Sequence, residues 1–239
     1  MSKSIYLALD FPTWEKSRQF LISNNLEGVP VKVGMELFYR EGPGIIEKLK
    51  ENNHPIFLDL KLHDIPTTVM KAMSNLAKLE VDMVNVHALG GSEMIKRAKE
   101  GLIKGSKSGH QTKLIAVTIL TSMDNETMNH ELLLPGDLDK NTIHFAKMAK
   151  QSGADGVVCS VHEVLKIKQK CGSTFSTVTP GIRLQTTSHD DQKRVSTPGF
   201  ARENGADLLV IGRSVTQAVN PYEAYQQAVK EWEADGITS

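Results

Sequence analysis

Cysteine is scarce in this sequence, which has only Cys159 and Cys171 among its 239 residues. Their spacing matches neither a C-x-x-C redox pair nor a zinc-binding pattern, so we interpret both as reduced packing residues. No apolar run approaches the ~20 residues that a membrane span requires. The apolar run at residues 5–9 is too short for a secretory signal. We therefore expect a cytoplasmic protein without a membrane partner.

Net charge is also absent, because 28 Lys and Arg residues balance 28 Asp and Glu residues. A chain without excess positive charge has no global field that would attract nucleic acid or an acidic membrane surface. Nucleic acid is therefore excluded as an expected partner. Any recognition of an anion must come from a local group of side chains.

What the sequence does contain is a repeated alternation of two patterns. Short, continuous, β-branched apolar runs are typical of strands that are buried on both faces of a parallel sheet. They occupy residues 5–9, 29–33, 56–60, 83–87, 114–119, 156–159, 175–178 and 208–211. Apolar residues at three- and four-residue spacing predict amphipathic helices between them. These helices are expected at residues 14–23, 43–50, 68–79, 93–104, 142–151, 162–168 and 222–232, with a weaker pattern within 197–204.

Eight strands that alternate with helices over about 240 residues predict a (β/α)₈ TIM barrel in the α/β class. A doubly wound open sheet is the alternative, since periodicity alone does not show closure. No linker or low-complexity tract divides the chain, so we expect one domain over residues 1–239. Residues 122–139 and 181–191 are the least regular segments and are predicted to be long loops that follow strands.

Charged side chains gather at the predicted ends of the first three strands. They are Asp10, Lys32, Asp59 and Lys61. Active sites of such barrels lie at the carboxyl ends of the strands. Lys32 interrupts an apolar run, and a buried lysine is costly unless it is paired. Asp10 and Asp59 are its natural partners on the neighbouring strands.

The third strand carries the sharpest pattern, Asp59-Leu60-Lys61-Leu62-His63-Asp64. Two residues apart in a strand, Asp59 and Lys61 are predicted to share a face. The structural alternative is an ion-paired strand end in which Asp64 caps the next helix. That alternative weakens because Asp10 and Lys32 converge on the same mouth.

A second group of residues follows the seventh and eighth strands, where phosphate sites of such barrels commonly lie. It comprises Pro180, Gly181, Arg183, Gln192, Gly212 and Arg213. A glycine lets backbone N–H groups approach an anion, and arginine grips phosphate oxygens through two parallel hydrogen bonds. The alternative is a turn glycine followed by a solvated arginine.

Two further pairs remain open at this point. His63 and His87 could flank Asp59 in a metal site, but two lysines in the same mouth already supply the charge of a cation. We therefore expect hydrogen-bonded structural histidines and no metal. Thr121 and Ser122 could hydrogen-bond a polar ring or merely cap the next turn.

These segments resemble the orotidine 5′-phosphate decarboxylase family over essentially the whole chain. The Asp59-x-Lys61-x-x-Asp64 pattern is shared with a wider group of phosphosugar decarboxylases. The continuations His63-Asp64-Ile65-Pro66 and Pro180-Gly181-Ile182-Arg183 are more specific to the orotidylate enzymes.

The resemblance implies decarboxylation of orotidine 5′-phosphate to UMP without a cofactor, in a homodimer whose Asp64 reaches the partner's site. It implies that Lys61 is the catalytic cation beside Asp59. The ribose would be bound by Asp10 and Lys32, with Asp64 and Thr68 of the partner. Thr121 and Ser122 would face the pyrimidine, and Gln192, Gly212, Arg213 and Arg183 the 5′-phosphate. Two alternatives are a metal-dependent phosphosugar decarboxylase or aldolase of the same barrel group and a catalytically silent phosphate-binding barrel.

Overall fold

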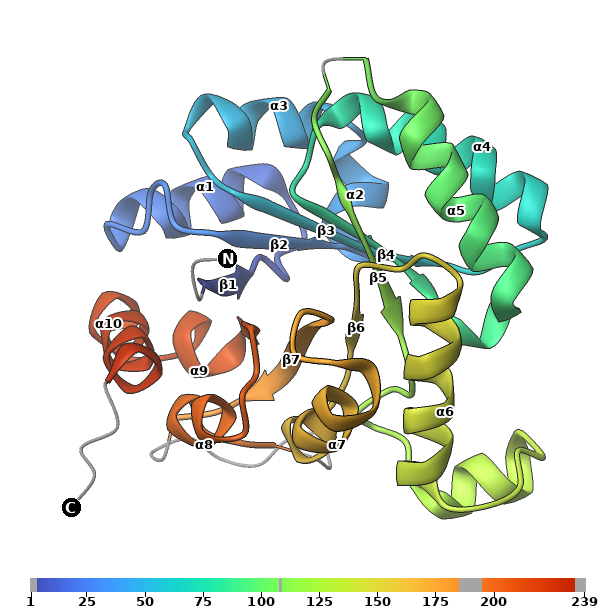
Figure 1. Cartoon of the computed structure of the whole chain (residues 1–239). Helices are drawn as coiled ribbons and strands as arrows, with labels where there is room; N and C mark the ends of the chain where they lie inside the picture. Colours follow the sequence, from blue (N-terminus) through green and yellow to red (C-terminus); the bar gives the residue numbers. More distant parts are fainter. Residues whose placement is uncertain (1–3, 108, 185–194, 235–239) are drawn as a thin grey trace.

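The strands form a closed parallel barrel in a computed structural model that describes residues 4–107, 109–184 and 195–234 (Figure 1). Strand order follows chain order, and the barrel is closed by pairing of the first strand with the eighth. Closure rules out the open sheet, and the predicted (β/α)₈ barrel is confirmed.

The strands are β1 (Ser4–Ala8), β2 (Val31–Gly34), β3 (Ile56–Leu62), β4 (Met83–His87), β5 (Lys113–Val117), β6 (Gly156–Val158), β7 (Ser176–Ile182) and β8 (Leu208–Ile211). The helices surround them in Figure 1. They are α1 (Trp14–Ser23), α2 (Met35–Glu41), α3 (Gly44–Glu51), α4 (Pro66–Leu76), α5 (Gly91–Gly105), α6 (Leu138–Gln151), α7 (Val161–Cys171), α8 (Pro198–Glu203), α9 (Arg213–Thr216) and α10 (Pro221–Glu233). Within the described ranges no helix is both long and apolar enough to cross a bilayer.

The structure differs from the sequence prediction in several connections. Helix α2 was not predicted, because it follows β2 directly and its N-cap, Gly34, offers no capping side chain as a start signal. The segment 122–139 is not wholly a loop, since Thr127–Glu131 forms a π-helical turn and α6 begins at Leu138. Strand β5 ends at Val117, two residues earlier than expected.

Alternation along the strands separates two apolar cores. Side chains of one parity, such as Leu7 and Val33, pack with the helices in the larger core around the barrel. Side chains of the other parity, such as Tyr6 and Phe57, fill the barrel interior. This alternation decides which polar residues near the strand ends point inward. Lys32, next to Val33 in β2, therefore belongs to the interior set.

Aspartates tie neighbouring strands together at the opposite, amino-terminal end of the barrel. Asp82 accepts a hydrogen bond from the backbone N–H of Ile56, at 2.6 Å. Asp155 and Asp207 accept equivalent bonds from Leu114 and Thr177, at 2.8 and 2.7 Å. Each aspartate precedes an even-numbered strand and binds the start of the strand before it. This end of the barrel is therefore built for stability, as is usual in the fold.

Candidate active site

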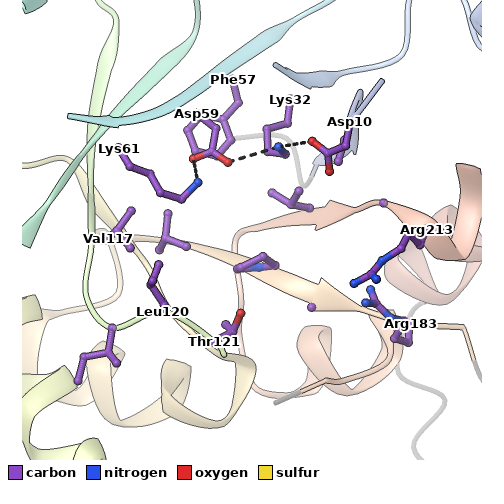
Figure 2. Close-up of a pocket in the computed structure, with 17 residues that line it drawn as sticks. Asp10, Lys32, Phe57, Asp59, Lys61, Val117, Leu120, Thr121, Arg183 and Arg213 are labelled. Carbon is purple, nitrogen blue, oxygen red and sulfur yellow. Dashed lines mark hydrogen bonds and ion pairs between the residues drawn. The ribbon is translucent and has the colours of Figure 1, made fainter. Parts of the chain in front are cut away.

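The four predicted charged residues form one alternating chain across β1, β2 and β3 (Figure 2). The Nζ atom of Lys32 lies 3.0 Å from Oδ1 of Asp10 and 3.4 Å from Oδ2 of Asp59. The Nζ atom of Lys61 lies 2.7 Å from Oδ1 of Asp59. The predicted pairing of Lys32 with both aspartates is confirmed. Negative and positive groups therefore alternate in the order Asp10, Lys32, Asp59, Lys61.

Burial makes the two inner members of this chain depend on each other. The side chains of Lys32 and Asp59 are each only 11% exposed. Burial alone would raise the pKa of Asp59, but the Lys32 and Lys61 ammonium groups and hydrogen bonds to Asp59 hold that pKa below its usual value. Burial alone would lower the pKa of Lys32, yet the carboxylates of Asp59 and Asp10 outweigh it and raise that pKa. Both groups are therefore ionised at neutral pH.

The outer members are more open to solvent. The side chain of Lys61 is 25% exposed, and that of Asp10 is 63% exposed. Figure 2 shows the Lys61 ammonium group extending from β3 into the cavity. A cation that reaches a cavity while one carboxylate oxygen restrains it can meet a second anion there.

Glycine at position 34 leaves room for the charged chain. A Cβ atom on Gly34 would lie 3.1 Å from Nζ of Lys32 and 3.3 Å from Oδ1 of Asp10. Either distance is tighter than ordinary carbon contacts, so a larger residue would push the ion pair apart. The end of β2 is therefore shaped around this pair.

The backbone of β3 departs from regular strand geometry beside the catalytic candidates. In the pairing of β3 with β4, Leu58 is opposite Val84 and Leu62 is opposite Val86. Three residues of β3, namely 59, 60 and 61, thus face one residue of β4, Asn85. Lys61 has a left-handed backbone with φ of 50°, which is uncommon for a residue other than glycine. The predicted contact of Asp59 with Lys61 is present, but across a bulge rather than along a flat strand.

A cavity lies at the carboxyl ends of the strands, beside the charged chain. Its walls combine charged, apolar and glycine-rich surfaces. The apolar part is contributed by Ala8, Phe57, Val117, Ile119, Leu120, Val158 and Val210. An apolar base with a few polar groups is typical of a site for a small organic molecule. The sequence analysis missed these apolar residues, because nothing separates them from ordinary core residues in the sequence.

Two arginines line the same cavity at the ends of β7 and β8. Arg183 and Arg213 extend from that side in Figure 2, opposite Lys61. Pro180, Gly181 and Gly212 line it as well. Gly181 has φ of 78°, a conformation that side chains disfavour. The predicted alternative of a solvated arginine is wrong for Arg183, which is 8% exposed. Gln192 lies outside the described residues.

Thr121 lines the cavity, whereas Ser122 is exposed and does not. Both residues follow the end of β5 by several positions, so the expectation that they end that strand is wrong. The polypeptide leaves the sheet after Val117 and continues through buried Thr118, whose hydroxyl donates to the carbonyl of Val158.

Asp64 and Thr68 lie away from the cavity of their own chain, and both are exposed. The alternative in which Asp64 caps the following helix is wrong. Ile65 is the N-cap of α4, without a side-chain cap bond, and Pro66 occupies the first turn. The Asp64 carboxylate accepts instead from the N–H of Ile65, at 2.6 Å. Helix α4 begins one residue later than a capping Asp64 would require.

His63 and His87 lie together, with ring centroids 5.8 Å apart. The expectation of a fully hydrogen-bonded histidine is wrong for His87, whose buried Nδ1 has no partner among the described atoms. Burial, with the neighbouring His63 and Lys61, lowers the pKa of His87. Among the residues that the structure describes, no three His, Cys, Asp or Glu side chains gather as a metal site would need.

Asn85 is a further polar residue that the sequence analysis left without a role. It is 1% exposed and belongs to the inward-facing set of β4. A buried amide must find hydrogen-bond partners, so a polar residue inside the run Met83–His87 was the available signal. Its partners are Asp59 and the backbone of Lys61, at 2.6 and 2.7 Å.

Comparison with known proteins agrees with this site. Residues 3–228 match the family described as Orotidine 5′-phosphate decarboxylase / HUMPS. Orotidine 5′-phosphate decarboxylases of Bacillus cytotoxicus and of Bacillus cereus AH820 are each 54% identical to this chain over 239 residues, the full length of both proteins.

Solved structures show the same similarity in three dimensions. Orotidine 5′-phosphate decarboxylase of Lactobacillus acidophilus has a TM-score of 0.87 and 43% identity, over 98% of this chain and 100% of that one. An uncharacterized conserved protein of Geobacillus kaustophilus has a TM-score of 0.84 and 45% identity, over 96% of this chain and 100% of that one. This chain therefore belongs to the orotidine 5′-phosphate decarboxylase / HUMPS family.

Proposed function

We propose that this chain decarboxylates orotidine 5′-phosphate to UMP and CO₂ in pyrimidine biosynthesis, without a metal or organic cofactor. One observation carries the proposal. The cavity has a restrained ammonium group, Lys61, at one side and two guanidinium groups, Arg183 and Arg213, at the other. An anionic substrate with a reacting carboxylate at one end and a phosphate at the other fits this arrangement. The proposal retains the cytoplasmic location expected from the sequence.

The phosphate end is assigned to the loops after β7 and β8. Arg213 and Arg183 would grip phosphate oxygens through charge-assisted hydrogen bonds, and Gly212 and Pro180 complete that wall. The family resemblance adds Gln192. Binding energy from this remote end can be used to hold the reacting end in place.

The nucleoside is assigned to the middle of the cavity. Asp10 and Lys32 would hydrogen-bond the ribose hydroxyl groups, since Asp10 keeps one exposed oxygen while Lys32 binds the other. The pyrimidine would lie on the apolar base, with Thr121 available to its polar edge. Ser122, exposed near the rim, would approach only in the substrate complex.

The reaction breaks the bond between C6 of the pyrimidine and its carboxylate carbon. The electron pair stays on C6, and CO₂ leaves. Lys61 would stabilise the developing carbanion electrostatically and then transfer a proton from Nζ to C6. The neutral amine would regain a proton from water. Product UMP then carries hydrogen at C6.

Asp59 gives this step its direction. The Asp59 carboxylate contacts Nζ of Lys61, so it would also face the substrate carboxylate. Two carboxylates repel in the bound substrate, and the repulsion is relieved as CO₂ forms. The attraction to Lys61 grows over the same interval, and interactions that strengthen toward the transition state accelerate a reaction.

The proposal includes a homodimer in which Asp64 and Thr68 of one chain complete the ribose pocket of the other. Their exposure outside their own chain's cavity supports this role. Large apolar residues near them are also exposed, including Ile65 at 67% and Leu89 at 38%. A second copy of the chain would cover this surface.

The function is tested by incubating purified protein with orotidine 5′-phosphate in excess EDTA. We expect the ultraviolet absorbance of orotidylate to disappear and mass spectrometry to identify UMP. A requirement for added divalent metal would indicate the phosphosugar decarboxylase or aldolase alternative. Binding of the nucleotide without turnover would indicate a catalytically silent barrel, and either result would contradict the proposal.

A further inference from the structure

The inference concerns Asn85, a buried residue of β4 that touches both members of the catalytic pair. Its Nδ2 donates to Oδ1 of Asp59 at 2.6 Å. Its Oδ1 accepts the backbone N–H of Lys61 at 2.7 Å. Oδ1 of Asp59 also accepts from Nζ of Lys61, at 2.7 Å. Three groups therefore close a ring in which Asn85 binds the acid and the base-bearing residue at once.

The position of Asn85 in the sheet explains why a side chain performs this task. Residues 59, 60 and 61 of β3 face the single residue 85 of β4, because the register shifts between Leu58 and Leu62. In a regular parallel pair the Lys61 N–H would bond to a backbone carbonyl. At the bulge the carboxamide of Asn85 takes the place of that carbonyl.

The backbone of Lys61 requires such support. Its φ of 50° is a left-handed conformation, and a residue other than glycine keeps it only when its surroundings enforce it. The bond from the Lys61 N–H to Asn85 is the contact that fixes this turn of the backbone. The turn in turn aims the long Lys61 side chain back toward Asp59.

We propose that Asn85 is a positioning residue of the decarboxylation, holding the Asp59 carboxylate and the Lys61 backbone so that the Lys61 ammonium meets the reacting carbon. The inference rests on the proposed roles of Asp59 and Lys61. Asn85 does not line the cavity, so it acts through these two residues and not on the substrate.

Two substitutions separate the two hydrogen bonds. Asn85→Leu keeps a similar volume and removes both bonds. Asn85→Asp keeps an oxygen that can accept the Lys61 N–H, but it presents a carboxylate to Asp59 in place of a donor. Thr112→Val is the matched control, because it removes a buried side-chain bond to the carbonyl of Val81 at the amino-terminal end of the barrel.

Activity is measured as kcat and KM for orotidine 5′-phosphate, with the dissociation constant of UMP as a separate measure of binding. Both Asn85 variants should lose about 10- to 100-fold in kcat, the scale of a misplaced catalytic group, with little change in UMP affinity. Thr112→Val should retain wild-type kcat even if its melting temperature falls. Wild-type kcat in either Asn85 variant would overturn the proposal.

Hydrogen exchange supplies a readout that does not depend on turnover. The amide of Lys61 should exchange faster in Asn85→Leu than in wild type or Thr112→Val, and stay protected in Asn85→Asp. Unchanged protection in Asn85→Leu would overturn the positioning role even if kcat fell. Because the exchange result stands whether or not the wild-type protein decarboxylates orotidylate, failure of the inference is distinguishable from failure of the proposed function.

Discussion

Asp59 and Lys61 form a 2.7 Å ion pair across a break in the regular geometry of one strand. The same Asp59 carboxylate contacts Lys32 through its other oxygen, at 3.4 Å. One buried carboxylate therefore restrains two ammonium groups, and only one of them, Lys61, extends into the cavity beyond the charged chain. This division separates a lysine suited to hold the substrate from a lysine suited to react with it.

Arg213 should act through the phosphate at a distance from the reacting bond. Arg213→Ala should lower kcat/KM for orotidine 5′-phosphate by about 1.5–3 kcal/mol, the scale of a hydrogen bond to a charged group. Steady-state kinetics with orotidine, which lacks the phosphate, should show little difference between variant and wild type. Equal losses on both substrates would assign Arg213 another role.

Gly34 should tolerate no added methyl group beside the charged chain. The Cβ of Gly34→Ala would press on Lys32 and Asp10, so kcat/KM should fall by about tenfold or more as the pair is displaced. Gly44→Ala is the matched control, since the space around Gly44 is open. An assay in which both alanine variants match wild type would show that the spacing of the pair does not matter.

The ion pair of Lys32 with Asp59 should make stability depend on acidity. The pKa of Asp59 is below its usual value, so its contribution to folding is present above about pH 4 and is lost as pH falls through the folded-state pKa. Lys32→Met removes the largest influence that lowers this pKa, leaving burial to raise it. On acidification, wild type should therefore lose stability faster than the variant.

Urea unfolding of both proteins at several pH values between about 6 and 3 measures this difference. The gap in unfolding free energy between wild type and Lys32→Met should shrink as pH falls. A gap that stays constant across that range would show that the ionisation of Asp59 is not linked to Lys32.

Asp64 should act across a dimer interface. Lys61→Ala and Asp64→Asn should each be severely impaired alone. Subunit exchange at equal amounts places both lesions in one site of each mixed dimer and neither in the other, so about a quarter of all sites should regain wild-type residues. If exchange is demonstrated by native mass spectrometry and activity does not exceed the sum of the parents, each site uses its own Asp64 or none.

Much of the site could be predicted because strand ends converge in a barrel. The charged residues at positions 10, 32, 59 and 61 needed only their strands, the alternation of side chains and closure to be brought together. The arginines at 183 and 213 followed from the same placement. Local sequence determined these features, and the barrel added only proximity.

The rest depends on tertiary pairing that local patterns do not encode. The bulge in β3 arises from its register with β4, so neither the left-handed backbone of Lys61 nor the task of Asn85 was visible in the sequence. The suggested cap at Asp64 failed for a similar reason, since the helix begins at Pro66 with Ile65 as its N-cap. Helix α2 lacked start signals because the tight exit from β2 uses Gly34.

The central claim is that Lys61 stabilises and protonates the carbanion. The most direct measurement is kcat of Lys61→Ala for orotidine 5′-phosphate in EDTA, with circular dichroism and melting temperature as controls for folding. Loss of both the proton donor and the stabilising charge should lower kcat by about 10⁴-fold or more, while the fold is retained. A folded Lys61→Ala protein with kcat within about tenfold of wild type would contradict the account.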